Sequence, residues 1–536
     1  MLLRISSRFL AKAFAAAVLV VLADRLFWVE KGAGSTLGFF ALAWVVATLA
    51  LAPRIRRDRR SWIAAIGALL LAAPLLDAPG LVALILFWTS LTMTVLLPRA
   101  PGFDHAGRWV LRLILHAIAS AVGPWQDLLQ LRRPLGRNLP KRRILPLLPL
   151  PLIGGAVFLA LFASANPVIG DALYNIGAPR LDDESIGRFL FWIAILTIVW
   201  ATLRPRRIDL PAIAPSAGAP LTLPGISTGS VLLALLTFNA LFALQNGLDI
   251  AFLWSGAPLP EGVTLADYAH RGAYPLIATA LLAGLFVLVA LRPGSATAAV
   301  PAIRRLVVLW IAQNVFLVAS SILRTIDYIE AYSLTGLRIA ALIWMALVAL
   351  GLMLIVWRML HGRSAGWLIN ANVAAALAVL GGATMIDLGA TAAAWNVRHA
   401  REVGGEGAAL DLCYLDGLGS SALTSLVALE LRPDLKPDFA DRVAWVRHRA
   451  LHQTLDRQRG GDWTWRDSRR LRQVRTMLAG SRLSVPSAGP AGRDCNGFLL
   501  PPPAPAERAP AEAPEPTASV AEQLVPMPAL TEGPVR

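Results

Sequence analysis

The chain has 536 residues, of which 56% are hydrophobic and only 16% are charged, and its mean hydropathy is +0.58. A soluble globular protein carries about a quarter of its residues as charges, so this composition excludes that class. The net charge of +16 lies in short clusters between apolar runs, which argues against nucleic-acid binding. Apolar runs of roughly 17 to 25 residues, without long alternating strand patterns, predict an all-α, polytopic helical membrane protein.

In chain order, about eleven segments are long enough to cross a bilayer as tilted or slightly short helices. They cover residues 11–28, 35–52, 61–76, 80–97, 145–165, 188–203, 228–247, 274–291, 306–323, 338–357 and 366–386. No cleavable signal peptide is recognisable, so the first segment is interpreted as a membrane helix. Because the first segment carries charges and the third and sixth are short, ten or twelve spans are alternatives.

Basic residues are concentrated in every second connection between these segments. They fall within residues 54–60, 99–143, 204–207, 292–305 and 358–363, whereas the intervening connections carry mostly Asp and Glu. Short cytoplasmic loops retain Arg and Lys, so this alternation predicts a cytoplasmic N-terminus in a bacterial inner membrane. An odd number of spans then places the C-terminal region in the periplasm, and a miscount by one would reverse that side.

The predicted organisation has five parts. Residues 1–97 form an N-terminal four-helix membrane segment, 98–144 a basic cytoplasmic loop, 145–386 a main membrane domain of about seven helices, 387–483 a small soluble helical appendage, and 484–536 a disordered Pro/Ala-rich tail. Within the basic loop, RWVLRLILHAIASAV predicts an interfacial amphipathic helix, with a buried packing helix as the alternative. Cys413 and Cys495 alone indicate no disulfide framework and leave the redox compartment open.

Polar side chains inside the apolar segments are candidates for function, because they are costly in hydrocarbon. Asn239 and Asn246 share a face of the seventh segment, with Asp249 at its outer end, and the ninth carries a similar stripe. We predict a polar cleft open to the outer face, formed by Asn239, Asn246, Asp249, Tyr268, Arg271, Asn314, Arg324, Tyr328, Arg338, Asn396, Asp411 and Tyr414. The alternative is hydrogen bonding that only holds helices together, at roughly 0.6 kcal/mol each.

Motifs of established chemistry are weak. HRALH places His448 and His452 at metal-ligand spacing but lacks the Glu of a metalloprotease, and GGEGAAL lacks the frame of a phosphate-binding loop. No catalytic triad order is identifiable. We therefore predict no cofactor and no metal, and we leave enzymatic activity open while leaning against it.

Four phrases resemble a known family: SANPVI from Ser164, QNGLDIAFLWSGAPLPEGVTLADYAHRGAYPLIATALLAG from Gln245, SSILRTIDYIEAYSLTGLRIAALIWM from Ser320, and WNVRHAREVGGEGAALDLCYLDGLG from Trp395. They are similar, over roughly residues 150–480, to a bacterial polytopic family known as a domain of unknown function of the four-one-seven-three type, related to the four-one-five-three type. The residues after Gly419 lack the Asp and Pro usual in that family. The resemblance implies architecture and candidate residues, not an activity.

These observations lead to one functional hypothesis and two alternatives. The first is a transport or ligand-sensing component of the inner membrane, which would take a small-molecule or lipid ligand in the polar cleft. The second is a membrane-embedded enzyme acting on lipid-linked or envelope substrates, with Asp249 or Asp411 as the base. The third is a non-catalytic scaffold that binds a protein partner through its C-terminal region.

Overall fold

The computed structural model describes residues 7–100, 105–131, 183–206, 227–255, 300–487 and 489–502, with a few isolated positions between these ranges. Over these residues the elements are helices, and the only pairing of extended backbone in this described part is a β-bridge between Arg493 and Leu499. The prediction of an all-helical fold is confirmed.

Seven helices in the described part of the chain are long and apolar enough to cross a membrane. They comprise α3 (Arg59–Asp77), α4 (Leu81–Leu96, extended by a 3-10 turn), α9 (Asp183–Leu203), α10 (Thr228–Asp249, continued by the π-turn η5, Ile250–Trp254), α13 (Pro301–Tyr332), α14 (Gly336–Leu360) and α15 (Ala365–Met385). The first two expected spans coincide with the shorter helices α1 (Ser7–Ala23) and α2 (Thr36–Leu51). The expected spans 145–165 and 274–291 lie outside the described residues, so the count of about eleven is not confirmed.

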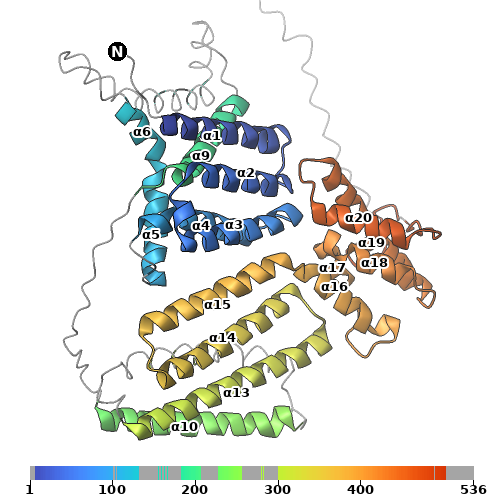
Figure 1. Cartoon of the computed structure of the whole chain (residues 1–536). Coiled ribbons are helices and arrows are strands. Elements are labelled where there is room, and N and C mark those ends of the chain that lie inside the picture. The colour runs from blue at the N-terminus through green and yellow to red at the C-terminus, as the bar shows by residue number, and fades with distance from the viewer. Residues whose placement is uncertain are drawn as a thin grey trace, which may run out of the picture.

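The long helices form two groups, which Figure 1 shows one above the other. α1 to α4 and α9 pack around Trp44, Leu75 and Phe87, and α10, α13 and α14 pack around Leu235 and Trp310. α15 joins the groups by contacting α3 and α4 on one side and α14 on the other. Large apolar side chains cover the outside of both groups, as expected for a surface that faces lipid rather than water.

Two opposite ends of this helix layer differ in charge. At one end Lys12, near the start of α1, donates to the carbonyl of Leu203 at the end of α9, and Arg304 at the start of α13 donates to Met359 O at the end of α14. The described parts of the arginine-rich connections expected to be cytoplasmic are at this end, which we call the basic end. α15 ends at the other end, where the C-terminal region begins (Figure 1).

Two further helices, α5 (Ala106–Ala121) and α6 (Gly123–Leu131), lie across the basic end, and α5 runs nearly perpendicular to the long helices (Figure 1). The backbone N–H of Ala106 donates to Oδ1 of Asn370 in α15 at 2.8 Å, so α5 reaches from α15 to α9. Its Arg112 and His116 side chains are buried against the protein, while Ile118 is exposed. Burial lowers the pKa of His116 to about 4.

The C-terminal region packs into one helical unit around Leu415, Leu423, Leu426 and Val443. It contains α16 (Leu388–His399), the 3-10 turn η6 (Arg401–Val403), α17 (Leu412–Leu418), α18 (Ser420–Glu430), α19 (Pro437–Arg459) and α20 (Trp465–Met477). α19 ends at Arg459, before Gly460 and Gly461, and Thr464 caps α20 by accepting the N–H of Asp467.

The packed region continues past Ser484, where the disordered tail was expected to begin. Ser484 donates to Glu430, and Arg493 pairs with Asp441 on α19. A disulfide joins Cys413 in α17 to Cys495, 82 positions away. The sequence reading missed this bond, which ties residues 484–502 to the helical unit, while residues 503–536 lie outside the described part.

Candidate functional site

α10 and α13 run side by side in the same direction and share a row of polar side chains, which we call the polar row: Asn239, Asn246, Asp249, Gln313 and Arg324. Two contacts set the parallel register, and each joins residues that are 67 positions apart in the chain. Asn239 Nδ2 donates to the backbone carbonyl of Leu306 at 3.1 Å, and Asn246 Nδ2 donates to the backbone carbonyl of Gln313 at 3.4 Å. Gln313 Nε2 returns a bond to Asn239 Oδ1 at 2.8 Å. Amide groups therefore cross-link two apolar helices.

An ion pair between Asp249 and Arg324 ends the polar row. The side chains are only 1% and 7% exposed, and Gln245 Nε2 donates to the same carboxylate oxygen of Asp249 at 3.0 Å. Removing both charges from water is costly unless they are paired, so the helices hold this pair in a fixed arrangement. From Asn239 to Asp249 the row extends ten residues, or about 15 Å of helix, which is about half of the hydrocarbon thickness.

The backbone changes its hydrogen-bond pattern at this ion pair. Asp249 is the last residue of α10, and the π-turn η5 follows directly. Trp254, at the end of the turn, donates from its indole nitrogen to Ser320 Oγ at 3.1 Å and stacks on Phe316, which anchors the turn to α13. Single π-turns inside helices are frequent at functional sites, so this irregularity is compatible with a functional role of the ion pair.

Some acceptor atoms of the polar row have no hydrogen-bond partner among the described residues. These atoms are Oδ1 of Asn246, Oε1 of Gln313 and Oδ2 of Asp249, and each is buried. An unpaired oxygen away from water loses its hydration without compensation, unless a donor or a cation supplies it. Chemically, the row can accept a hydrogen-bond donor or bind a positive charge beside Asp249.

The remaining candidates do not join one cleft. Asn314 is buried, but its Nδ2 donates to Trp310 O on its own helix at 2.8 Å. Arg338 lies over the Tyr328 ring at 4.2 Å and donates to the carbonyl of Tyr332 at 2.6 Å, so these residues shape the turn between α13 and α14. Tyr268 and Arg271 lie outside the described residues.

Two of the C-terminal candidates, Asn396 and Tyr414, bind the backbone of the turn between α13 and α14. Asn396 in α16 accepts the backbone N–H of Leu334 at 2.7 Å and donates to its carbonyl at 2.9 Å. The hydroxyl of Tyr414 accepts the N–H of Gly336 at 2.9 Å, and Asp411 caps α17 by accepting the N–H of Tyr414. Asn396 and Tyr414 thus form a clamp that fixes the start of α14, and Asp411 caps the helix that carries Tyr414.

Ion pairs dock the C-terminal region onto the long apolar helices at the end opposite the basic end. Arg466 and Arg469 of α20 both bind Asp77 at the end of α3, and Arg470 binds Asp387 after α15. The backbones of Gly461 and Glu30 also lie close together at this interface. A Cβ added to Gly461 would lie 2.0 Å from the carbonyl oxygen of Glu30, so a larger residue would not fit there. Sequence reasoning missed this interface, although the acidic connections and the Arg-rich helix were visible signals for it.

The HRALH segment forms no metal centre in the described part of the chain, where no group of three or more His, Cys, Asp or Glu side chains could hold an ion. His448 and His452 lie with ring centroids 4.2 Å apart. Burial, followed by the neighbouring His452 and Arg447, lowers the pKa of His448, which disfavours a second positive charge beside Arg447.

Comparison with known proteins gives a family but no activity. A family model described as "Domain of unknown function (DUF4153)" matches residues 62–429, which is more than half of the chain and contains the polar row and the clamp. No curated protein and no solved structure matches the chain. The sequence resemblance named the four-one-seven-three type, which is wrong: the matching family is the related four-one-five-three type. The chain belongs to the DUF4153 family.

Proposed function

We propose that this protein is a multi-pass component of a bacterial inner membrane that transports or senses a ligand, with the polar row between α10 and α13 as its functional centre. Several apolar helices and a family of unknown function are compatible with such a role. The observation that carries the proposal is the buried pair of Asp249 and Arg324. Charged side chains at membrane depth mark ion or substrate paths more often than they serve packing alone.

Two features distinguish the polar row from hydrogen bonds that merely hold helices together. The amide bonds between α10 and α13 would by themselves fit a packing role, but the row also contains the buried ion pair of Asp249 and Arg324. The row also leaves acceptor oxygens of Asn246 and Asp249 without a partner among the described residues. A bound cation or hydrogen-bond donor would satisfy these oxygens, and this is the ligand chemistry that we propose.

For the orientation, we propose a cytoplasmic N-terminus and a periplasmic C-terminal region. The basic connections lie at the end where α1 begins, and the positive-inside rule favours the cytoplasm for that end. The disulfide between Cys413 and Cys495 lies in the unit docked at the opposite end. Disulfides persist in the periplasm and are rare in the cytosol, so charge and cysteine chemistry support the same orientation.

The test replaces the ion pair by apolar residues of similar volume. Breaking a buried pair by one substitution costs about 3–5 kcal/mol, whereas replacing both partners is often neutral for stability. The double variant Asp249→Leu/Arg324→Met should therefore fold as the wild type does, as judged by yield and by size exclusion in detergent. It should fail to restore growth of a deletion strain across a panel of salt, pH and envelope stresses.

The matched control is Asp24→Leu/Arg188→Met, which replaces an ion pair in the N-terminal group of helices. That pair is partly exposed, with Arg188 39% accessible, and it is expected to be dispensable for function. Full complementation by the Asp249→Leu/Arg324→Met variant would refute the proposed role of the polar row. Failure of both double variants would mean that the growth assay reports folding rather than the polar row.

The two alternatives gain no specific observation. Asp411, one candidate base for an enzyme, is occupied as a helix cap. The Arg-rich helix α20 uses Arg466, Arg469 and Arg470 for docking onto this chain, so a protein partner of the C-terminal region stays a prediction.

A further inference from the structure

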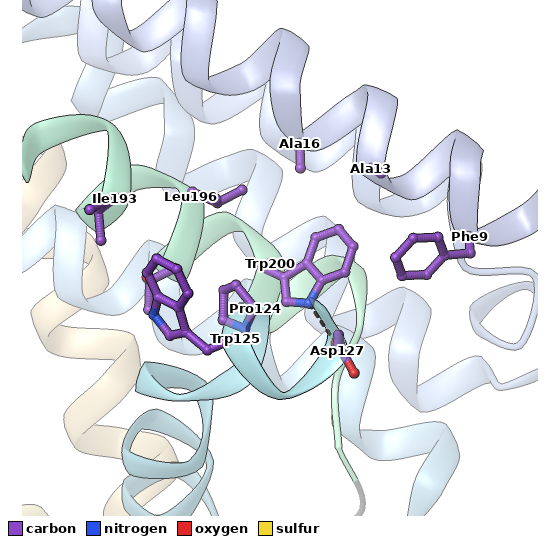
Figure 2. A pocket seen from close by; sticks show the side chains of 10 residues that line it. Phe9, Ala13, Ala16, Pro124, Trp125, Asp127, Ile193, Leu196 and Trp200 are labelled. Carbon is purple, nitrogen blue, oxygen red and sulfur yellow. Dashed lines mark hydrogen bonds between the residues drawn. The ribbon is translucent and has the colours of Figure 1, made fainter. Parts of the chain in front are cut away.

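A cavity of about 200 Å³ lies between α1, α6 and α9 at the basic end, far along the chain from the polar row. Figure 2 shows its walls: Phe9 and Ala13 come from α1, Trp125 from α6, and Leu196 and Trp200 from α9. Apart from one carboxylate and one hydroxyl, the lining side chains are apolar. An apolar cavity of about 150 Å³ already accommodates a benzene ring, so this space can hold several methylene groups.

The polar groups beside the cavity carry an excess of positive charge. Asp127 accepts the indole N–H of Trp200 at 2.8 Å and pairs with Arg204 at 3.4 Å and Arg206 at 3.3 Å. Lys12 adds a third cation, because its amino group donates to Leu203 O next to Arg204. Two arginines thus face one carboxylate at the rim of an apolar space, and the amino group of Lys12 lies beside one of them.

The surroundings of the cavity are those of a site within reach of lipid. On α1, Leu10 and Phe14 are 52% and 73% exposed beside the lining residues Phe9 and Ala13. Phe9 lies under the guanidinium of Arg204 at 5.1 Å, so the apolar and cationic parts adjoin directly. Basic pockets between membrane helices at the cytoplasmic side are suited to anionic lipid headgroups.

We propose that this cavity binds an anionic phospholipid of the cytoplasmic leaflet. One acyl chain occupies the space between Ala13, Trp125 and Leu196, and the headgroup phosphate is bound by Lys12, Arg204 and Arg206. The charge excess at the rim selects an anionic headgroup, and the apolar lining selects a lipid over a soluble phosphate. This lipid site is separate from the polar row and stands whether or not the polar row transports a ligand.

The experiment uses the full-length protein, purified in detergent with phosphatidylglycerol or with phosphatidylcholine of the same acyl chains. Native mass spectrometry counts the lipids that remain bound. We expect one phosphatidylglycerol per protein to be retained well above phosphatidylcholine. The variant Arg204→Gln/Arg206→Gln should lose this retention about 30-fold, because each cation near a membrane surface contributes about 1 kcal/mol.

A second variant tests the apolar part. Ala13→Trp fills the cavity from α1 and should abolish retention while leaving the rim charges in place, and Thr197→Trp fills it from α9 if the first variant does not fold. The matched control is Arg56→Gln/Arg57→Gln, which removes two exposed arginines at the same end outside the cavity and should retain the lipid.

Three outcomes would overturn the proposal. Equal loss in the control and in the Arg204→Gln/Arg206→Gln variant would show non-selective attraction of lipid to a basic surface. Undiminished retention in folded Ala13→Trp and Thr197→Trp variants would show that the chain lies elsewhere. Absence of any bound phosphatidylglycerol in the wild type would show that the cavity is empty or filled by the protein itself.

Discussion

The disulfide between Cys413 and Cys495 makes a quantitative prediction for the variant Cys495→Ser. The bond closes a chain segment of 82 positions, and the loss of loop entropy in the unfolded chain corresponds to a stabilisation of about 4.5 kcal/mol. Serine keeps the size of the side chain but not the cross-link. Residues 484–502 are then held by noncovalent contacts to α18 and α19, such as the pair of Arg493 with Asp441.

The assay is limited trypsin digestion of the full-length protein in detergent, with the fragments identified by mass. In the wild type, Arg493 is buried and should resist cleavage, whereas in Cys495→Ser it should be cut early. Cys413→Ser removes the same bond and should match Cys495→Ser, and reduction of the wild type should reproduce both. If all of these digest at the wild-type rate, the polar contacts suffice and the entropy argument is refuted.

Three other predictions follow from separate contacts. Asn396→Leu should lower the thermal stability in detergent, because it orphans two buried backbone groups at about 1–3 kcal/mol each; Asn372→Leu, whose amide bonds only its own helix, should have little effect. Acid should release the C-terminal region. At Asp387 and Asp441, burial opposes ionisation, but backbone N–H donors and arginines outweigh it and hold the pKa of each carboxyl below 3.8. This stabilisation is complete at neutral pH and is lost as the pH falls through those lowered pKa values. Tryptophan fluorescence should therefore stay constant from neutral pH to about pH 4 and should change below it. A reporter enzyme that works only in the periplasm should be active when it is fused after Ile386. Activity of a reporter that works only in the cytoplasm, fused at the same position, would refute the proposed orientation.

The helices themselves could be predicted because their signal is local. An apolar run of about 20 residues forms a helix in hydrocarbon wherever it lies in the chain, since every backbone group must bond within its own segment. The expected spans at 306–323 and 338–357 accordingly fall within α13 and α14. Helix ends were less certain, because caps such as Thr335 and Thr464 depend on a few side-chain bonds.

The candidate site could be predicted only in part. Asn239, Asn246, Asp249 and Arg324 stand out in the sequence because polar groups are rare in these helices, and the structure brings them together. Gln313 was missed, although it crosses from α13 to Asn239 on α10. Its role depends on the parallel register of the two helices, which no periodicity within either helix reveals.

Composition and apolar run length by themselves predicted an all-helical fold with several helices long and apolar enough to cross a membrane, and charge alternation predicted that the basic connections share one side. These properties depend only on residues that are close together in the chain, so they can be predicted without knowledge of the fold. Only the tertiary structure decided that Asn396 and Tyr414 stabilise the turn between α13 and α14, that Asp77 anchors α20, and that Cys413 meets Cys495. Each of these contacts joins residues far apart in the chain, and their geometry follows from how the helices pack rather than from any local pattern.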